Sequence, residues 1–327
     1  MTRVAAVDCG TNSIRLLIHD TDTGEVSRRN TIVRLGQGVD ETGKFAPEAI
    51  ERTRAALVDY VEEMQREHVT RVRMVATSAT RDAANREDFF AMTRELLGRI
   101  QPSAVAEVIT GEEEAALSFV GATADIDPAR GPFCVIDLGG GSTEFVMEGH
   151  AISTQMGCVR ITERIMRTDP PTAEETADAR ALIDEKIADA ASTIPFADAQ
   201  TFVGCAGTFT TLSALAQGLD SYDPERIHMS EIPFNRLREV TADLRAKTAA
   251  QRRENPAVHP GRADVIGSGS TVVEQLMDAF EREAGATSFI ISEKDILDGI
   301  VAGLDLSLIH ISEPTRREWL SRMPSSA

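Results

Sequence analysis

Two glycine-containing segments carry the residue types best suited to chemistry on phosphate. The first, Asp8-x-Gly-Thr-Asn-Ser13, lies between two apolar runs. Glycine lets backbone N–H groups approach a ligand closely, and successive amides with neighbouring hydroxyls form a donor surface for phosphate oxygens. Asp8 ends the first apolar run and is suited to hold a divalent cation, usually through water. The predicted phosphate donors here are Gly10, Thr11, Asn12, Ser13 and Arg15.

The second segment repeats this pattern and is the more specific of the two. It reads Asp137-Leu-Gly-Gly-Gly-Ser-Thr143 and is again flanked by apolar runs. Three consecutive glycines between strands are costly in conformational entropy, so a purely structural explanation is weak. The repeat predicts two related lobes whose loops face each other and clamp a phosphate and its metal. The predicted phosphate contacts are Gly139, Gly140, Gly141, Ser142 and Thr143.

A third glycine turn, Gly204-Cys-Ala-Gly207, joins an expected strand to an expected helix. A helix N-terminus offers free amides and a favourable dipole to an anion, so we add Gly207 to the predicted phosphate contacts. An ordinary strand-to-helix connection explains this turn equally well.

The candidate acid–base group is Gly111-Glu-Glu-Glu-Ala115, at the start of an expected helix. Acidic residues in a first helical turn are favoured by the helix dipole alone. One that faces the cleft would be placed to orient an attacking water, and the spacing is compatible with each of the three glutamates. The basic candidates are single arginines within small-residue loops: Arg81, Arg160 and Arg262.

Strands that alternate with helices indicate an α/β fold around these segments. Apart from the two hairpins, the expected strands span residues 71–76, 104–109, 201–204 and 288–291. The expected helices span residues 47–68, 86–100, 112–121, 172–194, 207–216, 233–247, 264–284 and 295–304. A turn-rich stretch over residues 125–132 predicts the boundary between a lobe of residues 1–125 and a lobe of residues 126–294.

Composition narrows the class of protein. The formal net charge of −18 opposes binding to nucleic acid or an anionic membrane. No run approaches the roughly 20 apolar residues of a membrane helix, and the N-terminus lacks a signal-peptide core. The 4 scattered cysteines indicate reduced thiols, so we expect a cytoplasmic protein. A protein with this net charge binds a polyanion only at a site where arginines, backbone amides and a divalent cation lie close together.

The sequence resembles the Ppx/GppA phosphatases, within the actin/sugar-kinase/Hsp70-like superfamily, over about residues 2–304. The resemblance rests on Asp8-x-Gly-Thr-Asn-Ser-x-Arg15, Ala79-Thr-Arg-Asp-Ala-x-Asn85, Gly111-x-Glu-Glu-Ala115, Asp137-Leu-Gly-Gly-Gly-Ser-Thr-Glu144, Met156-Gly-Cys-Val-Arg160 and Ser292-Glu-x-Asp-Ile-Leu-Asp-Gly299. It implies two ribonuclease-H-like (actin-like) lobes with mixed five-stranded sheets, flanking helices and a cleft between them. It also implies that a last helix, about residues 295–305, packs back on the first lobe.

The resemblance assigns roles to individual residues. Glu114 is the implied catalytic base, and Arg81 is an implied phosphate contact. Asp137 and Glu144 belong to the implied metal and water network, which Asp8 completes. A Mg²⁺ cofactor and a homodimer are implied as well.

The function we expect is processive release of terminal phosphate from polyphosphate by Mg²⁺-assisted attack of water. Hydrolysis of guanosine pentaphosphate at its 5′ end is the first alternative, because the same loops serve both substrates. A non-catalytic alarmone sensor is the second. A sugar or acetate-type kinase on the same fold is disfavoured by the motifs at residues 111–115 and 292–299.

The last segment of the chain, from about Leu306 onward, fits nothing before it. Residues 306–316 resemble the translation of a transposon-type sequencing adapter. We therefore expect residues 306–327 to be a non-native tail. The alternative is that the natural protein is a longer family member with a further helical C-terminal module.

Overall fold

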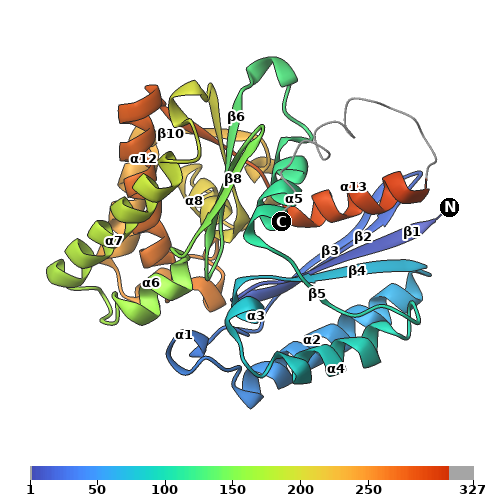
Figure 1. The fold of residues 1–327 in the computed structure, drawn as a ribbon. Helices are drawn as coiled ribbons and strands as arrows, with labels where there is room; N and C mark the ends of the chain where they lie inside the picture. The colour runs from blue at the N-terminus through green and yellow to red at the C-terminus, as the bar shows by residue number, and fades with distance from the viewer. Residues whose placement is uncertain (1, 309–327) are drawn as a thin grey trace.

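The computed structural model describes residues 2–308, which form two α/β lobes, each built on one mixed sheet (Figure 1). The first sheet has 5 strands in the order β3-β2-β1-β4-β5, and the second has 6 in the order β10-β11-β9-β6-β7-β8. The strands are β1 (Arg3–Cys9), β2 (Ser13–Asp20), β3 (Gly24–Ile32), β4 (Arg71–Ala76), β5 (Glu107–Val108), β6 (Phe133–Leu138), β7 (Thr143–Met147), β8 (His150–Thr154), β9 (Thr201–Cys205), β10 (Ser230–Pro233) and β11 (Ser288–Ile291).

The helices alternate with these strands, which confirms the expected α/β class. They are α1 (Val39–Thr42), α2 (Pro47–Arg66), α3 (Ser78–Asp82), α4 (Arg86–Leu97), α5 (Gly111–Thr123), α6 (Cys158–Arg164), α7 (Ala173–Ala191), α8 (Ala206–Ala216), α9 (Pro224–Ile227), α10 (Phe234–Ala246), α11 (Ala249–Arg253), α12 (Ile266–Ala284) and α13 (Ile296–Leu308). Short 3-10 turns lie at Pro128–Arg130, Phe196–Asp198 and Pro260–Arg262. Within the described residues, every helix is too short or too polar to cross a membrane.

The first lobe is organised around strand β1, which is covered on both faces. Ala5 and Val7 face the core shared with α2 and α4, whereas Val4 and Ala6 face α13. This period of two explains why β1 reads as a nearly continuous apolar run. β1 pairs antiparallel with β2, opposing Asp8 to Arg15, and parallel with β4. The first hairpin therefore projects its loop from the centre of the sheet.

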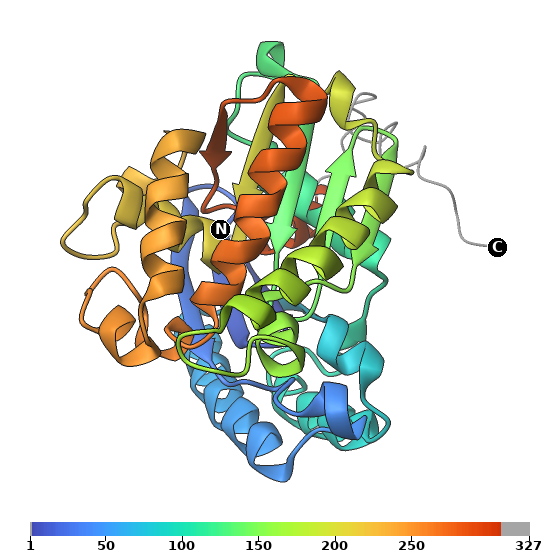
Figure 2. The same ribbon diagram turned by 90° about the vertical axis from the view of Figure 1, so that its left-hand side faces the viewer.

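The second lobe repeats this arrangement with β6 and β7. The antiparallel pair opposes Asp137 to Glu144, and β6 continues parallel to β9. Figure 2 shows α7, α10 and α12 lying over one face of this sheet, where Phe145, Phe196 and Phe280 form a ring cluster. A sixth strand, β10, pairs antiparallel with β11 at the sheet edge, so this sheet is one strand wider than expected.

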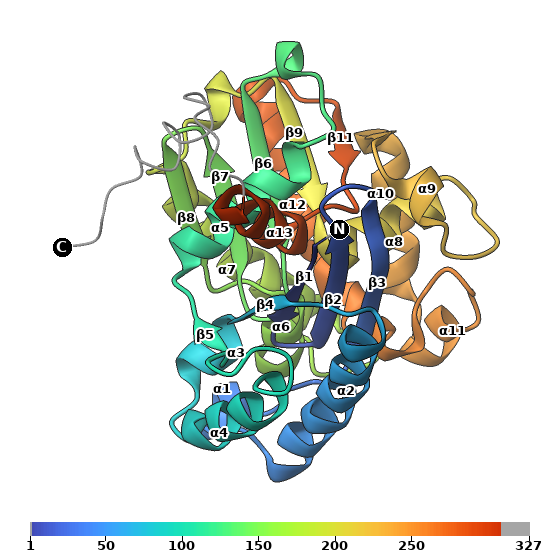
Figure 3. The ribbon, with the colours of Figure 1, turned by 90° about the vertical axis from the view of Figure 1, so that its right-hand side faces the viewer.

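Two helices, α5 and α13, cross between the lobes (Figure 3). α5 packs on β6, β7 and β8, whereas α13 packs on β1, β2 and β4. Their backbones nearly touch, because a Cβ atom added at Gly299 would lie 2.1 Å from the carbonyl oxygen of Leu117. The second sheet is thus covered by α5, which comes before it in the chain, and the first sheet by α13, which comes after both sheets. Of the expected tail, only the last turn of α13, which runs to Leu308, is described, and residues 309–327 lie outside the described part.

Candidate active site

The two glycine loops face each other across the cleft between the lobes, which encloses about 760 Å³ of empty space open to solvent. Each loop is closed by the same backbone hydrogen bond: Gly10 N–H donates to Ser13 O at 3.0 Å, and Gly139 N–H donates to Ser142 O at 3.0 Å. A Cβ atom at Gly141 would lie 2.6 Å from the hydroxyl oxygens of both Thr11 and Ser78. Glycine is therefore required where the second loop lies against the first lobe.

Most of the residues singled out in the sequence come together on the wall of this cleft. They are Asp8, Gly10, Thr11, Asn12, Ser13, Arg15, Glu114, Asp137, Gly139, Gly140, Gly141, Ser142 and Gly207. Arg81, Thr143 and Glu144 do not line it. Their side chains lie behind the residues that do.

Thr143 and Glu144 are buried on β7. The Thr143 hydroxyl donates to the carbonyl oxygen of Met156 at 3.1 Å, so it is used within the second lobe. Glu144 accepts a hydrogen bond from the Ser153 hydroxyl at 2.6 Å. Burial, followed by the neighbouring charge of Asp137, raises the pKa of Glu144 to about 7. The geometry gives these two residues supporting positions and no direct access to the cleft.

Glu114 is the one glutamate of its helical turn that faces the cleft. Glu112 and Glu113 are exposed, and Glu113 forms an ion pair with Arg73 at 2.7 Å. Glu114 is buried in the first turn of α5, whose N-cap Thr110 accepts from Glu113 N–H at 3.2 Å. The structure therefore separates three residues that the sequence leaves equivalent.

Arg81 supports Glu114 from behind. Its guanidinium donates from Nη1 to Glu114 Oε2 at 2.9 Å and to the carbonyl oxygen of Ile109 at 2.9 Å. Burial is the main cause that raises the pKa of Glu114 well above its ordinary value, with the charge of Glu144 second, while Arg81 opposes both. A buried carboxyl of raised pKa with one fixed cationic partner has the properties of a general base.

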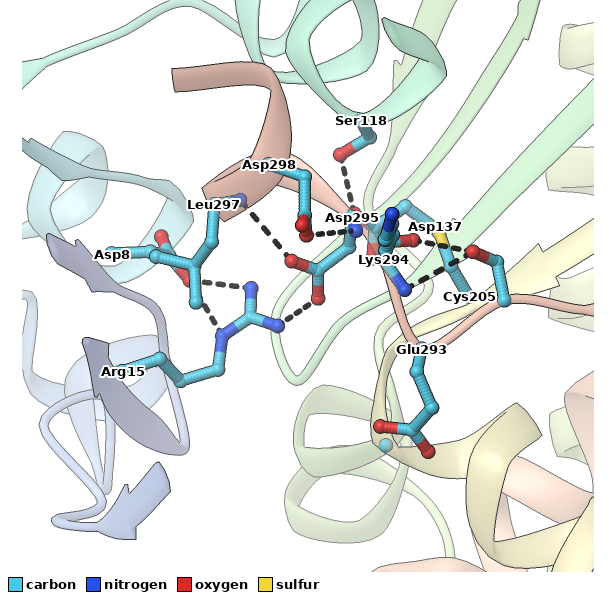
Figure 4. A network of polar contacts seen from close by, with 12 residues as sticks. Asp8, Arg15, Ser118, Asp137, Cys205, Glu293, Lys294, Asp295, Leu297 and Asp298 are labelled. Carbon is cyan, nitrogen blue, oxygen red and sulfur yellow. Dashed lines mark hydrogen bonds and ion pairs between the residues drawn. The ribbon is translucent and has the colours of Figure 1, made fainter. Parts of the chain in front are cut away.

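Asp137 is held by a residue that sequence reasoning missed. The Ser118 hydroxyl donates to Asp137 Oδ2 at 2.6 Å (Figure 4), and Ser118 lies one helical turn after Glu114 on α5. Burial, followed by the charge of Asp295, raises the pKa of Asp137 to about 6. A single serine within a helix forms no motif, so nothing in the sequence singled it out.

Asp8 is bound by Arg15 through one of its two oxygens. Arg15 donates to Asp8 Oδ2 from Nε at 3.0 Å and from Nη2 at 2.6 Å, and its Nη1 donates to Asp295 Oδ2 (Figure 4). The other oxygen, Asp8 Oδ1, is buried without a hydrogen-bond partner. Asp295 lies in the motif at residues 292–299, but the sequence alone gave it no role.

The unpartnered oxygen of Asp8 fits a divalent cation, because Mg²⁺ prefers carboxylate and water oxygens. Among the described residues, no three His, Cys, Asp or Glu side chains gather closely enough to hold a metal ion by themselves. A cation at Asp8 would therefore complete its coordination with water and phosphate oxygens. Asp137 reaches the same cleft, whereas Glu144 does not.

The third glycine turn brings Arg262 into the cleft. Ala206 adopts a φ of 67°, a left-handed conformation that costs a non-glycine residue on the order of 1 kcal/mol. A Cβ atom at Gly207 would lie 2.2 Å from Arg262 Cζ, so the guanidinium rests on the start of α8. Burial lowers the pKa of Arg262, although arginine stays charged. Arg262 is thus a cationic group on the cleft wall.

Arg160 has a different position from Arg262. Its Nε donates to the carbonyl oxygen of Gly141 at 2.8 Å, and its Nη2 donates to Asp82 at 2.8 Å. Nη1 forms an ion pair with Asp40. Arg160 comes from the second lobe and both carboxylates come from the first, so it ties the lobes together beside the cleft.

These features define the class of protein. Two lobes that each begin with an Asp-ended hairpin, two helices that cross between them and glycine loops facing across a cleft form the actin-like fold, here with donors suited to phosphate. The chain belongs to the Ppx/GppA phosphatase family, whose model matches residues 17–303.

Known proteins of similar sequence and structure agree with this assignment. Exopolyphosphatase 2 of Mycobacterium tuberculosis is 53% identical over 315 residues, which cover 93% of this chain and 99% of the relative. The crystal structure of an exopolyphosphatase-like protein matches with a TM-score of 0.90 and 39% identity, covering 94% of this chain and 100% of that one. The Ppx/GppA family member from Aquifex aeolicus matches with a TM-score of 0.76 and 30% identity, over 95% and 99% of the two chains.

Proposed function

We propose that this protein is an exopolyphosphatase that hydrolyses the terminal phosphate of inorganic polyphosphate. The observation that carries the proposal is the position of Glu114, buried on the wall of the cleft that both glycine loops enter. The M. tuberculosis relative that is 53% identical to this chain bears the name exopolyphosphatase 2, which supports the same substrate.

The loops bind and orient the terminal phosphate. Donors from residues 10–13 and 139–142 approach it from the two lobes, and Arg262 adds positive charge from the third turn. Transition states of phosphoryl transfer need charge stabilisation above all, so fixed donors supply a large part of the rate. The same local cluster explains how a protein of net charge −18 holds a polyanion.

Glu114 acts on the attacking water. It orients the water in line with the terminal phosphate and accepts a proton as the new P–O bond forms, while the shortened polyphosphate leaves. Arg81 fixes the carboxylate through its contact with Oε2, which leaves Oε1 for the water. The raised pKa of Glu114 makes its carboxylate a stronger base.

We propose Mg²⁺ as the cofactor, held at Asp8 Oδ1 with Asp137 ordering its water. When bound there, the cation would neutralise charge on the phosphate oxygens. Ser118 keeps Asp137 oriented toward the cleft for that role.

Phosphate release with a panel of substrates tests the proposed function. We expect the full chain to release orthophosphate from polyphosphate with Mg²⁺ present and to stop when EDTA is added. Release from guanosine pentaphosphate alone would replace polyphosphate with that nucleotide as substrate. Binding of the nucleotide without release from either compound would contradict hydrolysis and leave a sensor.

A further inference from the structure

Arg15 is a cleft arginine whose charge is already neutralised within the protein. It lines the cleft, yet all three of its guanidinium nitrogens donate to carboxylates: Nε and Nη2 to Asp8, and Nη1 to Asp295. Its side chain is 17% exposed, so the guanidinium is close to the cleft surface without being free. These three bonds use three of the five N–H donors of the guanidinium, so a phosphate oxygen that approaches Arg15 meets a cation already shared between two carboxylates.

Asp295 is fixed in place by the start of α13. Its Oδ1 accepts the N–H of Leu297 at 3.1 Å, and its own N–H donates to Asp298 Oδ2 at 3.0 Å (Figure 4). The close crossing of α13 with α5 at Gly121 and Gly299 holds that helix end against the site. Asp295 is 3% exposed and does not line the cleft, so it draws Arg15 from behind.

We propose that Asp295 is a positioning residue that competes with phosphate for Arg15 and thereby weakens the binding of both substrate and product. The inference rests on the proposed function. Ion-paired hydrogen bonds are stronger than neutral ones, so Asp295 holds the Nη1 end of Arg15 toward itself and offsets part of its positive charge, and a phosphate gains the full arginine only by drawing it away from Asp295. After hydrolysis, the return of Arg15 to Asp295 favours the departure of orthophosphate.

Asp295→Asn tests this competition without removing the helix cap. Asparagine caps helices as well as aspartate does, and its single oxygen cannot serve both Leu297 N–H and Arg15. We expect the KM for polyphosphate and the inhibition constant for orthophosphate each to fall about fivefold to tenfold, while kcat stays within about threefold. Structural damage would raise these two constants, so their fall is specific to the proposal.

The matched control is Asp305→Asn, which removes the same charge from the same helix without touching Asp295. Asp305 pairs with His19 at 3.4 Å and does not line the cleft, so we expect the KM to change less than twofold. In an Arg15→Gln background, Asp295→Asn should leave the KM unchanged, because no competition is left. An unchanged or higher KM for Asp295→Asn, or an equal fall in the Arg15→Gln background, would overturn the proposal.

Calorimetric titration of tripolyphosphate into Glu114→Gln protein, with and without Asp295→Asn, measures the same effect without turnover. We expect about fivefold to tenfold tighter binding with the second substitution, and unchanged binding would refute the competition. Asp295→Ser, which keeps a capping hydroxyl, replaces Asp295→Asn if that variant does not fold. Failure of the wild type to hydrolyse polyphosphate would refute the proposed function while leaving this binding comparison readable.

Discussion

Glu114 differs from Glu113, its exposed neighbour, chiefly in burial, and burial gives a carboxylate the properties of a base. Asp137 and Glu144 are buried as well, and each has a raised pKa. Groups of this kind make an active site costly to fold at neutral pH, because their ionised forms are poorly solvated.

The pKa values of Asp137 and Glu144 predict how stability depends on pH. Both are raised in the folded protein, to about 6 and about 7, so folding favours their protonated forms. The contribution is fully present below the unfolded pKa, near 4, and is lost as pH rises through the folded values. We expect the metal-free protein to unfold more easily at pH 8 than Glu144→Gln does, and the difference to shrink as the pH falls and to vanish near pH 4. Urea unfolding in EDTA at both pH values measures this. An equal difference at both would contradict it.

Ser118 offers a prediction at the same scale. Ser118→Ala removes the hydrogen bond to Asp137 Oδ2 and leaves that carboxylate free to turn. We expect the concentration of Mg²⁺ needed for half-maximal phosphate release to rise about tenfold. The matched control is Ser213→Ala, a fully buried serine that bonds Ser230 and does not line the cleft, and it should leave the Mg²⁺ requirement unchanged. Equal effects of the two variants would show that Ser118 matters only for packing.

The residues of the site were recognisable in the sequence where they form motifs. Asp8, Asp137 and both glycine loops line the cleft as predicted from their repeated pattern. Ser118 and Asp295 act through single contacts from α5 and α13, and no local pattern encodes such contacts. The sequence also does not show that the Thr143 side chain turns away from the cleft. Its orientation is fixed by the hydrogen bond that its hydroxyl donates to Met156 O.

At the scale of elements, the crossing of α5 and α13 is the feature that brings Glu114, Ser118 and Asp295 to one place. Gly299 permits it, because any Cβ there meets the carbonyl of Leu117 at 2.1 Å. A backbone atom cannot move aside as a side chain can. The crossing therefore depends on glycine in a helix that would otherwise favour alanine.

Gly299→Ala tests the crossing against Gly303→Ala on the same helix. A Cβ at Gly303 meets nothing within 4 Å, so the change there should stabilise the protein by up to about 1 kcal/mol through helix propensity. Gly299→Ala should destabilise it by about 2 kcal/mol through overpacking. Thermal unfolding of both variants measures the difference. Similar melting temperatures for the two variants would show that α5 and α13 can move apart at Gly299 without loss of stability.

The elements themselves were predictable in proportion to their burial. Strand β4 spans the expected residues 71–76, and α2 ends two residues before the expected position. Strands β3, β8 and β10 were not expected. β3 and β10 are edge strands with polar, partly exposed residues, and β8 is the short edge strand at the other side of the second sheet. Most residues of these three strands are partly exposed, so the apolar pattern that predicts a buried strand is weak there.

For the whole molecule, the relation between the lobes sets the width of the cleft. Arg160 joins Asp40 and Asp82 of the first lobe, and Arg34 joins Asp264 of the second at 2.8 Å. The Arg160 side chain is 9% exposed, and Asp40 also forms an ion pair with Arg164, so Asp40 keeps a cationic partner when Arg160 is removed. The lobes are thus held by ion pairs in addition to the two crossing helices.

Arg160→Ala should lower the free energy of unfolding by about 2 kcal/mol, because the buried hydrogen bonds of its guanidinium to Gly141 O and to Asp82 are lost. Arg130→Ala, which breaks a 45% exposed pair with Glu231 within the second lobe, should cost less than about 1 kcal/mol. Urea unfolding provides both values. If Arg160→Ala lowered the free energy of unfolding no more than Arg130→Ala does, the ion pairs between the lobes would not stabilise the fold.

The role of Glu114 is tested most directly by the rate of phosphate release from polyphosphate by Glu114→Gln, compared with wild type and with Glu113→Gln under saturating Mg²⁺. Glu113 carries the same charge on the same helical turn but is exposed, so its substitution controls for charge near the cleft. We expect a loss of about 10²- to 10⁴-fold for Glu114→Gln and of less than about twofold for Glu113→Gln. Activity of Glu114→Gln within about tenfold of wild type would contradict the assignment of Glu114 as the base.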